Sequence, residues 1–207
     1  MRRCLAREKE SATPCYGATL GSVGVAGELW RQTAQAAGLG EKTKVHGVGD
    51  GAEWITTQFG GRGQYLVDFW HVSEYLGAAA PVIQPQKPVA WRRRQQGRLL
   101  ENQVAAVWRA LTPHLEPEGQ AEAPVRAAHR YLSGRWDQLD YAGSRAAGRP
   151  IGSGEIESGH RHVIQQRLKR AGGWGKEPNA QAMLGLRVAR ANQRWDSYWT
   201  QPQHASN

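Results

Sequence analysis

The strongest constraint on the fold is a short segment that predicts a strand, a helix and a second strand in close succession. Residues 43–49 predict a strand, and Gly51 after Asp50 allows a tight turn at its end. A brief helix is predicted over residues 53–59, followed by an apolar strand over residues 64–69 that can be buried on both faces. This order is typical of a parallel β-α-β unit in an α/β fold, where ligands bind at the carboxyl ends of the strands.

The segment before this unit predicts two further strands and a helix. Residues 1–8 and 12–19 predict short strands joined by a polar turn, and the first would form an exposed sheet edge. From Ser22 a helix is predicted as far as Ala37, where glycines follow and end it. A strand with no earlier strand to pair with is an unusual start for a domain.

The stretch from residue 77 to residue 149 predicts short helices and no strands. Apolar residues recur there at helical spacing in two stripes, one containing Trp108 and the other Tyr131. Prolines interrupt helices, and we expect six of them to divide this stretch into separate helices: Pro81, Pro85, Pro88, Pro113, Pro117 and Pro124. We therefore predict four segments: a core over 1–76, a helical insertion over 77–149, C-terminal helices over 150–199 and a disordered tail over 200–207.

A proline- and glycine-rich loop at residues 150–154 leads into a strongly basic helix. Ser153 can cap this helix through its side-chain oxygen. Glu157 lies in the first turn, four residues before Arg161, and this pair has two interpretations. It is either an ordinary surface pair worth about 0.2–0.5 kcal/mol, or a carboxylate that holds a divalent metal while the basic face meets a polyanion.

The net charge narrows the class of partner. The 207 residues contain 27 Lys and Arg against 18 Asp and Glu, a formal charge of +9, which favours a polyanion such as DNA. No apolar run approaches the length of a membrane span and no lipidation motif is present, so a membrane is not an expected partner. Cys4 and Cys15 are the only cysteines, which fits a reducing cytoplasm and excludes a cysteine-based zinc site.

Basic residues gather in the C-terminal part of the chain and at the start of the predicted insertion. Trp174, between glycines, could stack on an unpaired base, although a core position is commoner for tryptophan. The residues predicted to contact DNA are Trp174, Arg92, Arg93, Arg94, Arg161, Arg167, Lys169, Arg170 and Lys176.

Four acidic residues are candidates for chemistry: Asp50, Asp68, Glu155 and Glu157. Carboxylates that converge on Mg²⁺ or Mn²⁺ suit phosphodiester chemistry, because the metal polarises the phosphate and generates the attacking hydroxyl. From the residues alone, Asp50 is equally well explained as a turn former, and Asp68 is better explained as a hydrogen-bond acceptor within the fold. His71 could assist catalysis, but a single histidine at a helix start is more often a packing or capping residue.

Together these motifs resemble the DDE transposases of bacterial insertion sequences, and among them the ISKra-type group related to Mutator-like transposases. The resemblance covers nearly the whole chain in order. It rests on GDGAEWI at residues 49–55, DFWH at 68–71, GSGEIES at 152–158, QRLK at 166–169, AMLGLRVARAN at 182–192 and the end of the chain around 195–199. The resemblance implies an RNase H-like fold with a helical insertion before the last catalytic helix.

The same resemblance implies roles for individual residues. Asp50 corresponds to the second catalytic aspartate and Glu157 to the catalytic glutamate, which would bind Mg²⁺ or Mn²⁺. His71 belongs to the family's aspartate–aromatic–aromatic–histidine pattern, and Glu155 is the substitute candidate for Glu157. No aspartate precedes Asp50, whereas the family's first catalytic aspartate lies on an upstream strand. We therefore expect an N-terminally truncated transposase with an incomplete RNase H-like core, and no DNA cleavage by this chain alone.

The sequence thus predicts the C-terminal catalytic-domain portion of a transposase that cuts and joins transposon-end DNA in the bacterial cytoplasm, associated with the nucleoid. The alternative is a non-enzymatic DNA-binding remnant that occupies transposon ends or pairs with a complete transposase. For either interpretation, the expected protein partners are a second copy of the chain, in a homodimer, or a complete transposase. A basic α/β domain with an unrelated partner is a third interpretation. If the first is right, the carboxylates of Asp50 and Glu157 share a metal site and Asp68 points away from it.

Overall fold

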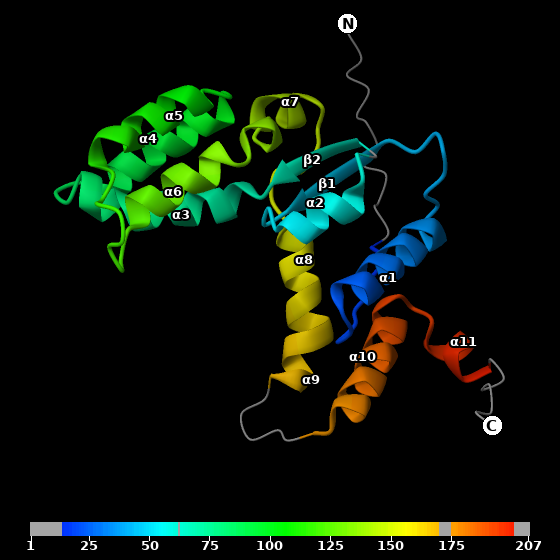
Figure 1. Ribbon diagram of the computed structural model, residues 1–207. Coiled ribbons are helices and arrows are strands. Elements are labelled where there is room, and N and C mark those ends of the chain that lie inside the picture. Colours follow the sequence, from blue (N-terminus) through cyan, green and yellow to red (C-terminus); the bar gives the residue numbers. More distant parts are fainter. Residues whose placement is uncertain (1–13, 62, 170–174, 201–207) are drawn as a thin grey trace, which may run out of the picture. The chain divides into compact units, whose positions relative to one another are not determined.

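The computed structural model describes residues 14–61, 63–169 and 175–200, and it is an α/β structure made mostly of helices (Figure 1). It divides into two compact units, which we describe separately. The sheet unit comprises Thr43–Gly154, and the helical unit comprises Met1–Lys42 and Glu155–Asn207 as far as they are described. The predicted strand at residues 1–8 and the predicted tail beyond Thr200 lie outside the described residues.

The sheet unit contains the predicted parallel β-α-β arrangement. Strands β1 (Val45–Gly49) and β2 (Gly63–Val67) pair in parallel, with Val45 opposite Gly63 and Gly49 opposite Val67. Helix α2 (Glu53–Phe59) connects them and packs closely on β1 at Gly47. A Cβ atom at Gly47 would lie 2.9 Å from the Phe59 ring and 3.0 Å from the Tyr65 ring, so a larger residue there would push α2 off the strand.

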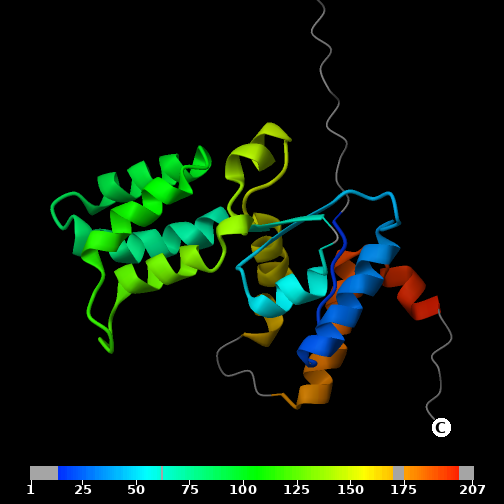
Figure 2. The same cartoon turned by 45° about the horizontal axis from the view of Figure 1, so that its top comes forward.

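The rest of the sheet unit is helical, as the sequence predicts. Four of its helices lie side by side in both ribbon views (Figures 1 and 2): α3 (Phe69–Ile83), α4 (Pro88–Leu100), α5 (Val104–Leu111) and α6 (Pro124–Ser133). The 3₁₀ turns η1 (Thr112–His114) and η2 (Trp136–Gln138) and the short helix α7 (Tyr141–Ala146) complete it. One continuous core joins strands and helices, and its fully buried members include Leu66, Val67, Val72, Leu76, Leu99, Val107, Leu111, Leu132 and Tyr141.

Two prolines of this region start α-helices rather than break them. Pro88 and Pro124 lie in the first turns of α4 and α6, where the missing N–H has no helical partner to lose. The prediction that Pro81 interrupts a helix is wrong, because Pro81 lies inside α3. It lies in the last turn, so one backbone hydrogen bond is lost there, while the adjacent Ala79 and Ala80 stay buried in the core.

The described helices of the helical unit begin with α1 (Val23–Ala36), which confirms the helix predicted from Ser22, and the side chain of Ser22 caps it. The predicted strand over 12–19 is wrong for residues 14–19, which form no strand, and residues 12 and 13 lie outside the described residues. The side-chain amide of Asn192 instead binds both backbone groups of Tyr16, at 2.8 Å each. These hydrogen bonds replace those that a neighbouring strand would supply.

The remaining helices of this unit are α8 (Gly154–Gly159), the π-helical η3 (His160–Gln165), α9 (Gln166–Leu168), α10 (Glu177–Ala191) and α11 (Trp195–Thr200). The predicted helix after Ser153 is thus present, with a π-helical middle. Arg187 of α10 donates to the backbone carbonyls of His162 and Val163 in η3. Across both units, none of the described helices is both long and apolar enough to span a bilayer.

Carboxylates that accept hydrogen bonds fix the starts of two helices, α6 and α7, in the sheet unit. Glu116 is buried and accepts hydrogen bonds from the backbone N–H groups of Val125 and Arg126, at 2.9 and 2.8 Å, in the first turn of α6. Burial alone would raise the pKa of Glu116, but these hydrogen bonds and the nearby Arg126 hold the pKa below its usual value. Asp140, which caps α7, likewise has a lowered pKa, chiefly because Asn102 donates to it.

We predict that Glu116→Gln destabilises the chain at neutral pH by about 1–3 kcal/mol, because two buried N–H groups lose a charged acceptor. A lowered pKa in the folded state adds stability above the unfolded pKa, and this stability disappears as pH falls through the folded value. Urea unfolding between pH 7 and pH 3 should therefore show a weaker acid dependence in Glu116→Gln than in the natural chain. The matched control is Glu122→Gln, at an exposed carboxylate in the same loop. Equal acid dependence in the natural chain and Glu116→Gln would contradict this assignment.

Candidate functional site

Asp50 directly follows β1 at the carboxyl end of the parallel strand pair, and its side chain is exposed. One carboxylate oxygen, Oδ1, accepts a hydrogen bond from the backbone N–H of Ala52 at 2.9 Å. Gly51 adopts a left-handed conformation with φ of 77°, which confirms the tight turn predicted after Asp50. The turn therefore presents the carboxylate to solvent at the edge where α/β folds bind their ligands.

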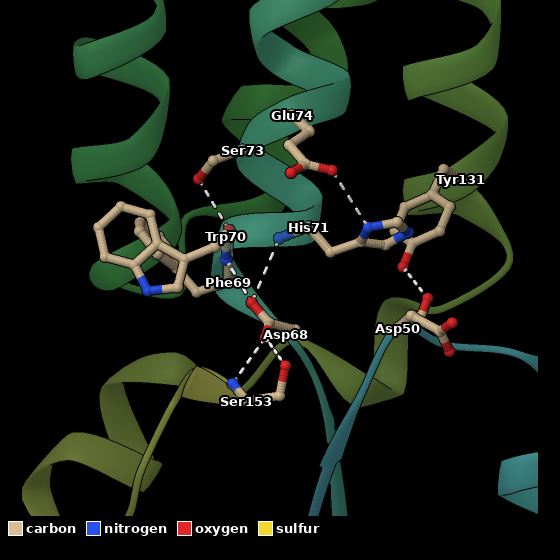
Figure 3. A network of polar contacts seen from close by, with 9 residues as sticks. All are labelled: Asp50, Asp68, Phe69, Trp70, His71, Ser73, Glu74, Tyr131 and Ser153. Atoms are coloured by element: carbon tan, nitrogen blue, oxygen red, sulfur yellow. Dashed lines mark hydrogen bonds and ion pairs between the residues drawn. The ribbon is translucent and has the colours of Figure 1, made fainter. Parts of the chain in front are cut away.

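Three side chains bind the backbone of this turn. The Tyr131 hydroxyl donates to the carbonyl of Asp50 at 2.6 Å (Figure 3). Arg135 donates to the carbonyl of Gly51 from Nε at 3.1 Å and from Nη2 at 2.9 Å. The Tyr65 hydroxyl, from β2, accepts the N–H of Gly51 at 3.2 Å.

Sequence reasoning missed this role for Tyr131 and Arg135. It placed Tyr131 in an apolar stripe, which is correct for its ring but says nothing of its hydroxyl. The one signal available was an arginine four residues after a tyrosine on a helix. Burial raises the pKa of Tyr131 well above its usual value, so the hydroxyl remains protonated and can donate at neutral pH.

Asp68, the second aspartate at this edge, has a different environment. It is buried, follows the last residue of β2, and caps α3 by accepting the N–H groups of Trp70 at 2.6 Å and His71 at 3.2 Å. Its other oxygen accepts both the N–H of Ser153, at 2.6 Å, and the Ser153 hydroxyl (Figure 3). Burial opposes ionisation, but these hydrogen bonds outweigh it and lower the pKa of Asp68. Asp68 thus has the structural role that the sequence favoured.

The loop before α8 is bound to the same edge of the sheet. The Phe69 N–H donates to the carbonyl of Ile151 at 2.9 Å, and the Trp70 indole lies so close to Gly152 that a Cβ there would be 2.8 Å from it. The hydroxyl of Ser153, predicted to cap the helix, binds Asp68 instead. The chain therefore enters α8 from the carboxyl ends of β1 and β2.

His71 packs among aromatic rings beside the Asp50 turn. Its ring meets those of Tyr75 and Tyr131 edge to face, with centroids 5.5 and 5.6 Å away. Its Nδ1 lies 3.4 Å from Oε2 of Glu74 (Figure 3). His71 is thus a partly exposed packing residue. It contacts Tyr131, whose hydroxyl binds the Asp50 turn.

Glu157 lies on α8, in the helical unit, with an exposed side chain. Because Asp50 belongs to the sheet unit, their shared metal site stays a prediction. Among the described residues, no ion pair joins Glu157 to Arg161, and π-helical geometry begins between them at His160. Such segments are frequent at functional sites. The backbone of Glu155 belongs to α8, and its side chain lies outside the description.

Most of the predicted DNA-binding residues that the structure describes are exposed. Arg93 and Arg94 lie on α4, whereas Arg92 is half-buried and packs beside Gly77 of α3. In the helical unit, the exposed members of the predicted set are Arg161, Arg167, Lys169 and Lys176. Arg170 and Trp174 lie outside the described residues.

Within residues 14–61, 63–169 and 175–200, no three His, Cys, Asp or Glu side chains gather as a metal-binding group. Comparison with known proteins found no matching family model, no matching curated protein and no matching solved structure. The geometry of the Asp50 turn and the residues around it therefore carry the functional argument.

We predict that Gly51→Ala destabilises the chain by about 2–4 kcal/mol, because two costs add. The alanine would have to adopt the left-handed backbone conformation of Gly51. Its Cβ would also lie 2.4 Å from Nε of Arg135 and 3.0 Å from the Tyr131 hydroxyl. Gly148→Ala is the matched control, since Gly148 also has a positive φ, 67°, but nothing within 4 Å of the added atom. Its cost should be only about 1–2 kcal/mol in urea unfolding. Equal costs for the two variants would show that Arg135 and Tyr131 do not confine the turn.

Proposed function

We propose that this chain is the catalytic-domain portion of an insertion-sequence DDE transposase, with an RNase H-like core, which acts on transposon-end DNA through Mg²⁺ or Mn²⁺. The proposal rests on the exposed Asp50 carboxylate at the carboxyl end of a parallel strand. Three side chains hold its turn, whereas the neighbouring aspartate, Asp68, is buried and used by the fold. All the hydrogen bonds of the Asp68 carboxylate serve the fold, whereas the described donors to the Asp50 carboxylate reach only Oδ1, through the turn-forming N–H of Ala52.

The order of elements supports the same proposal. After α1 comes the β1–α2–β2 unit with Asp50, then the helices from α3 to α7, and then α8 with Glu157, ahead of the remaining C-terminal helices. This is the order that the resemblance to DDE transposases implies, with a helical insertion ahead of the helix that carries the glutamate. The hydrogen bonds from Ser153 to Asp68 hold residue 153 at the carboxyl end of β2, four residues before Glu157.

The donor chemistry of the two proposed ligands fits a hard divalent cation. Within the described part of the chain, the N–H of Ala52 is the one hydrogen-bond donor to the Asp50 carboxylate, and it contacts Oδ1, so Oδ2 can coordinate. Glu157 would supply a second carboxylate from an exposed position. A bound Mg²⁺ would polarise the phosphate and activate the attacking oxygen. The contribution of the protein is to hold Asp50 still and to bind the DNA backbone.

We predict that the chain binds DNA with an affinity that falls steeply with salt, because phosphate contacts release counterions. The double substitution Arg167→Ala and Lys169→Ala should lower the slope of log affinity against log salt by about 0.9 for each lost phosphate contact. Fluorescence anisotropy with labelled duplexes from 50 to 200 mM salt measures this slope. Lys42→Ala with Lys44→Ala removes the same charge at positions outside the predicted set. An identical slope change in both variants would mean that only net charge matters.

Metal-dependent nicking separates an enzyme from a non-enzymatic DNA-binding protein. The chain should be assayed with supercoiled DNA, alone and with an N-terminal extension that carries an Asp-Gly strand from a DDE transposase. Nicking by the extended form in Mg²⁺ or Mn²⁺ that disappears in Asp50→Asn and in Glu157→Gln supports the proposal, and the chain alone should not nick. Glu53→Gln, at an exposed carboxylate three residues after Asp50, is the control and should retain nicking. DNA binding without nicking in either form would favour the non-enzymatic alternative.

A further inference from the structure

We propose that Tyr131 and Arg135 are positioning residues for Asp50, so that the helical part of the sheet unit sets how the carboxylate meets a divalent cation. The identity of the ligand rests on the proposed function. The geometry rests on contacts within the sheet unit alone, between residues more than eighty positions apart in the sequence.

The backbone groups of the Asp50 turn are nearly all bound. Tyr131 binds the carbonyl of Asp50, Arg135 binds the carbonyl of Gly51, and Tyr65 binds the N–H of Gly51. The carboxylate of Asp50 takes the N–H of Ala52. Two of these partners come from the end of α6 and the residues after it, so the turn depends on the helices as much as on its own strand.

Tyr131 is itself held on several sides. Its ring stacks on Tyr75, with centroids 4.2 Å apart and planes 21° apart. The guanidinium of Arg135 lies over the same ring, 4.1 Å from the centroid. The His71 ring also packs on the Tyr131 ring in a T-shaped arrangement. Figure 3 shows His71 and Tyr131 next to Asp50. The direction of the Tyr131 hydroxyl is therefore fixed by packing before it meets the turn.

A fixed turn improves a metal ligand because less conformational freedom remains to be lost on binding. Loss of the Tyr131 hydroxyl removes one neutral hydrogen bond, which corresponds to an effect of about fivefold on the opening of the turn. Arg135→Lys keeps the charge but removes the planar fork, so its effect should be at least as large. Both effects should appear at Asp50 without unfolding of the helices.

Tyr141 provides a matched control for this inference. It is fully buried, and its hydroxyl donates to the carbonyl of Val67 at 3.0 Å, at the end of β2. Tyr141→Phe thus removes the same kind of hydrogen bond, from a tyrosine to a strand-end carbonyl, without touching the Asp50 turn. It reports what a purely structural role would do.

The test uses the full chain labelled with ¹⁵N. Amide hydrogen exchange of Gly51 and Ala52 measures how often the turn opens, and broadening of the same signals by Mn²⁺ measures metal binding at Asp50. In Tyr131→Phe and Arg135→Lys, we expect exchange to accelerate about fivefold or more and half-maximal broadening to need a similarly higher Mn²⁺ concentration. Tyr141→Phe should leave both quantities at their values in the natural chain.

The outcomes separate this inference from the proposed function. If Mn²⁺ broadens these signals equally in the natural chain, Tyr131→Phe and Arg135→Lys, the inference is overturned and the metal site stands. If Tyr141→Phe has the same effects as Tyr131→Phe, the role is structural and the inference is also overturned. If Mn²⁺ leaves Gly51 and Ala52 of the natural chain unchanged, the proposed metal ligand is wrong, and the inference falls with it.

Discussion

The hydrogen bonds of Asp68 are the interaction on which the sheet unit most depends. One carboxylate ends β2, starts α3 and ties down the loop that leads into α8, through donors from Trp70, His71 and Ser153. A buried charge is tolerated only when it is so bound, and the lowered pKa of Asp68 shows that these donors outweigh burial. The carboxylate of Asp68 is thus fully engaged within the fold, whereas that of Asp50 binds only the N–H of Ala52 among the described donors.

At Asp50 the fold binds the backbone of the residue, whereas at Asp68 it binds the carboxylate. The Asp50 carboxylate is exposed, since Tyr131, Arg135 and Tyr65 contact the turn rather than the side chain. The two strand ends therefore hold chemically identical residues in different states. One stabilises the junction of strand, helix and loop, and the other is presented at the ligand-binding edge of an α/β unit.

The sequence predicts those elements whose cause is local. The Asp-Gly turn, α2 and the capped helix α1 follow from residues within a few positions of each other, and the structure confirms them. Pro81 within α3 and the extended segment at Tyr16 could not be predicted, because buried contacts and a distant asparagine decide them. The same holds for the candidate site, where the aspartates were identified from the sequence and their distant partners Tyr131, Arg135 and Ser153 were not. Their hydroxyl and guanidinium groups bind residues that are far away in the sequence, and hydrophobic periodicity reports only local structure.

The central proposal is that Asp50 and Glu157 bind one divalent cation. Fe²⁺ bound in place of Mg²⁺, with ascorbate and peroxide, cleaves the polypeptide backbone beside its ligands. Mass spectrometry of the protein fragments locates the cuts. The account predicts cuts next to both Asp50 and Glu157, suppressed by excess Mg²⁺ and absent in Asp50→Asn. Cuts beside only one of these residues, or cuts that persist in Asp50→Asn, would contradict it.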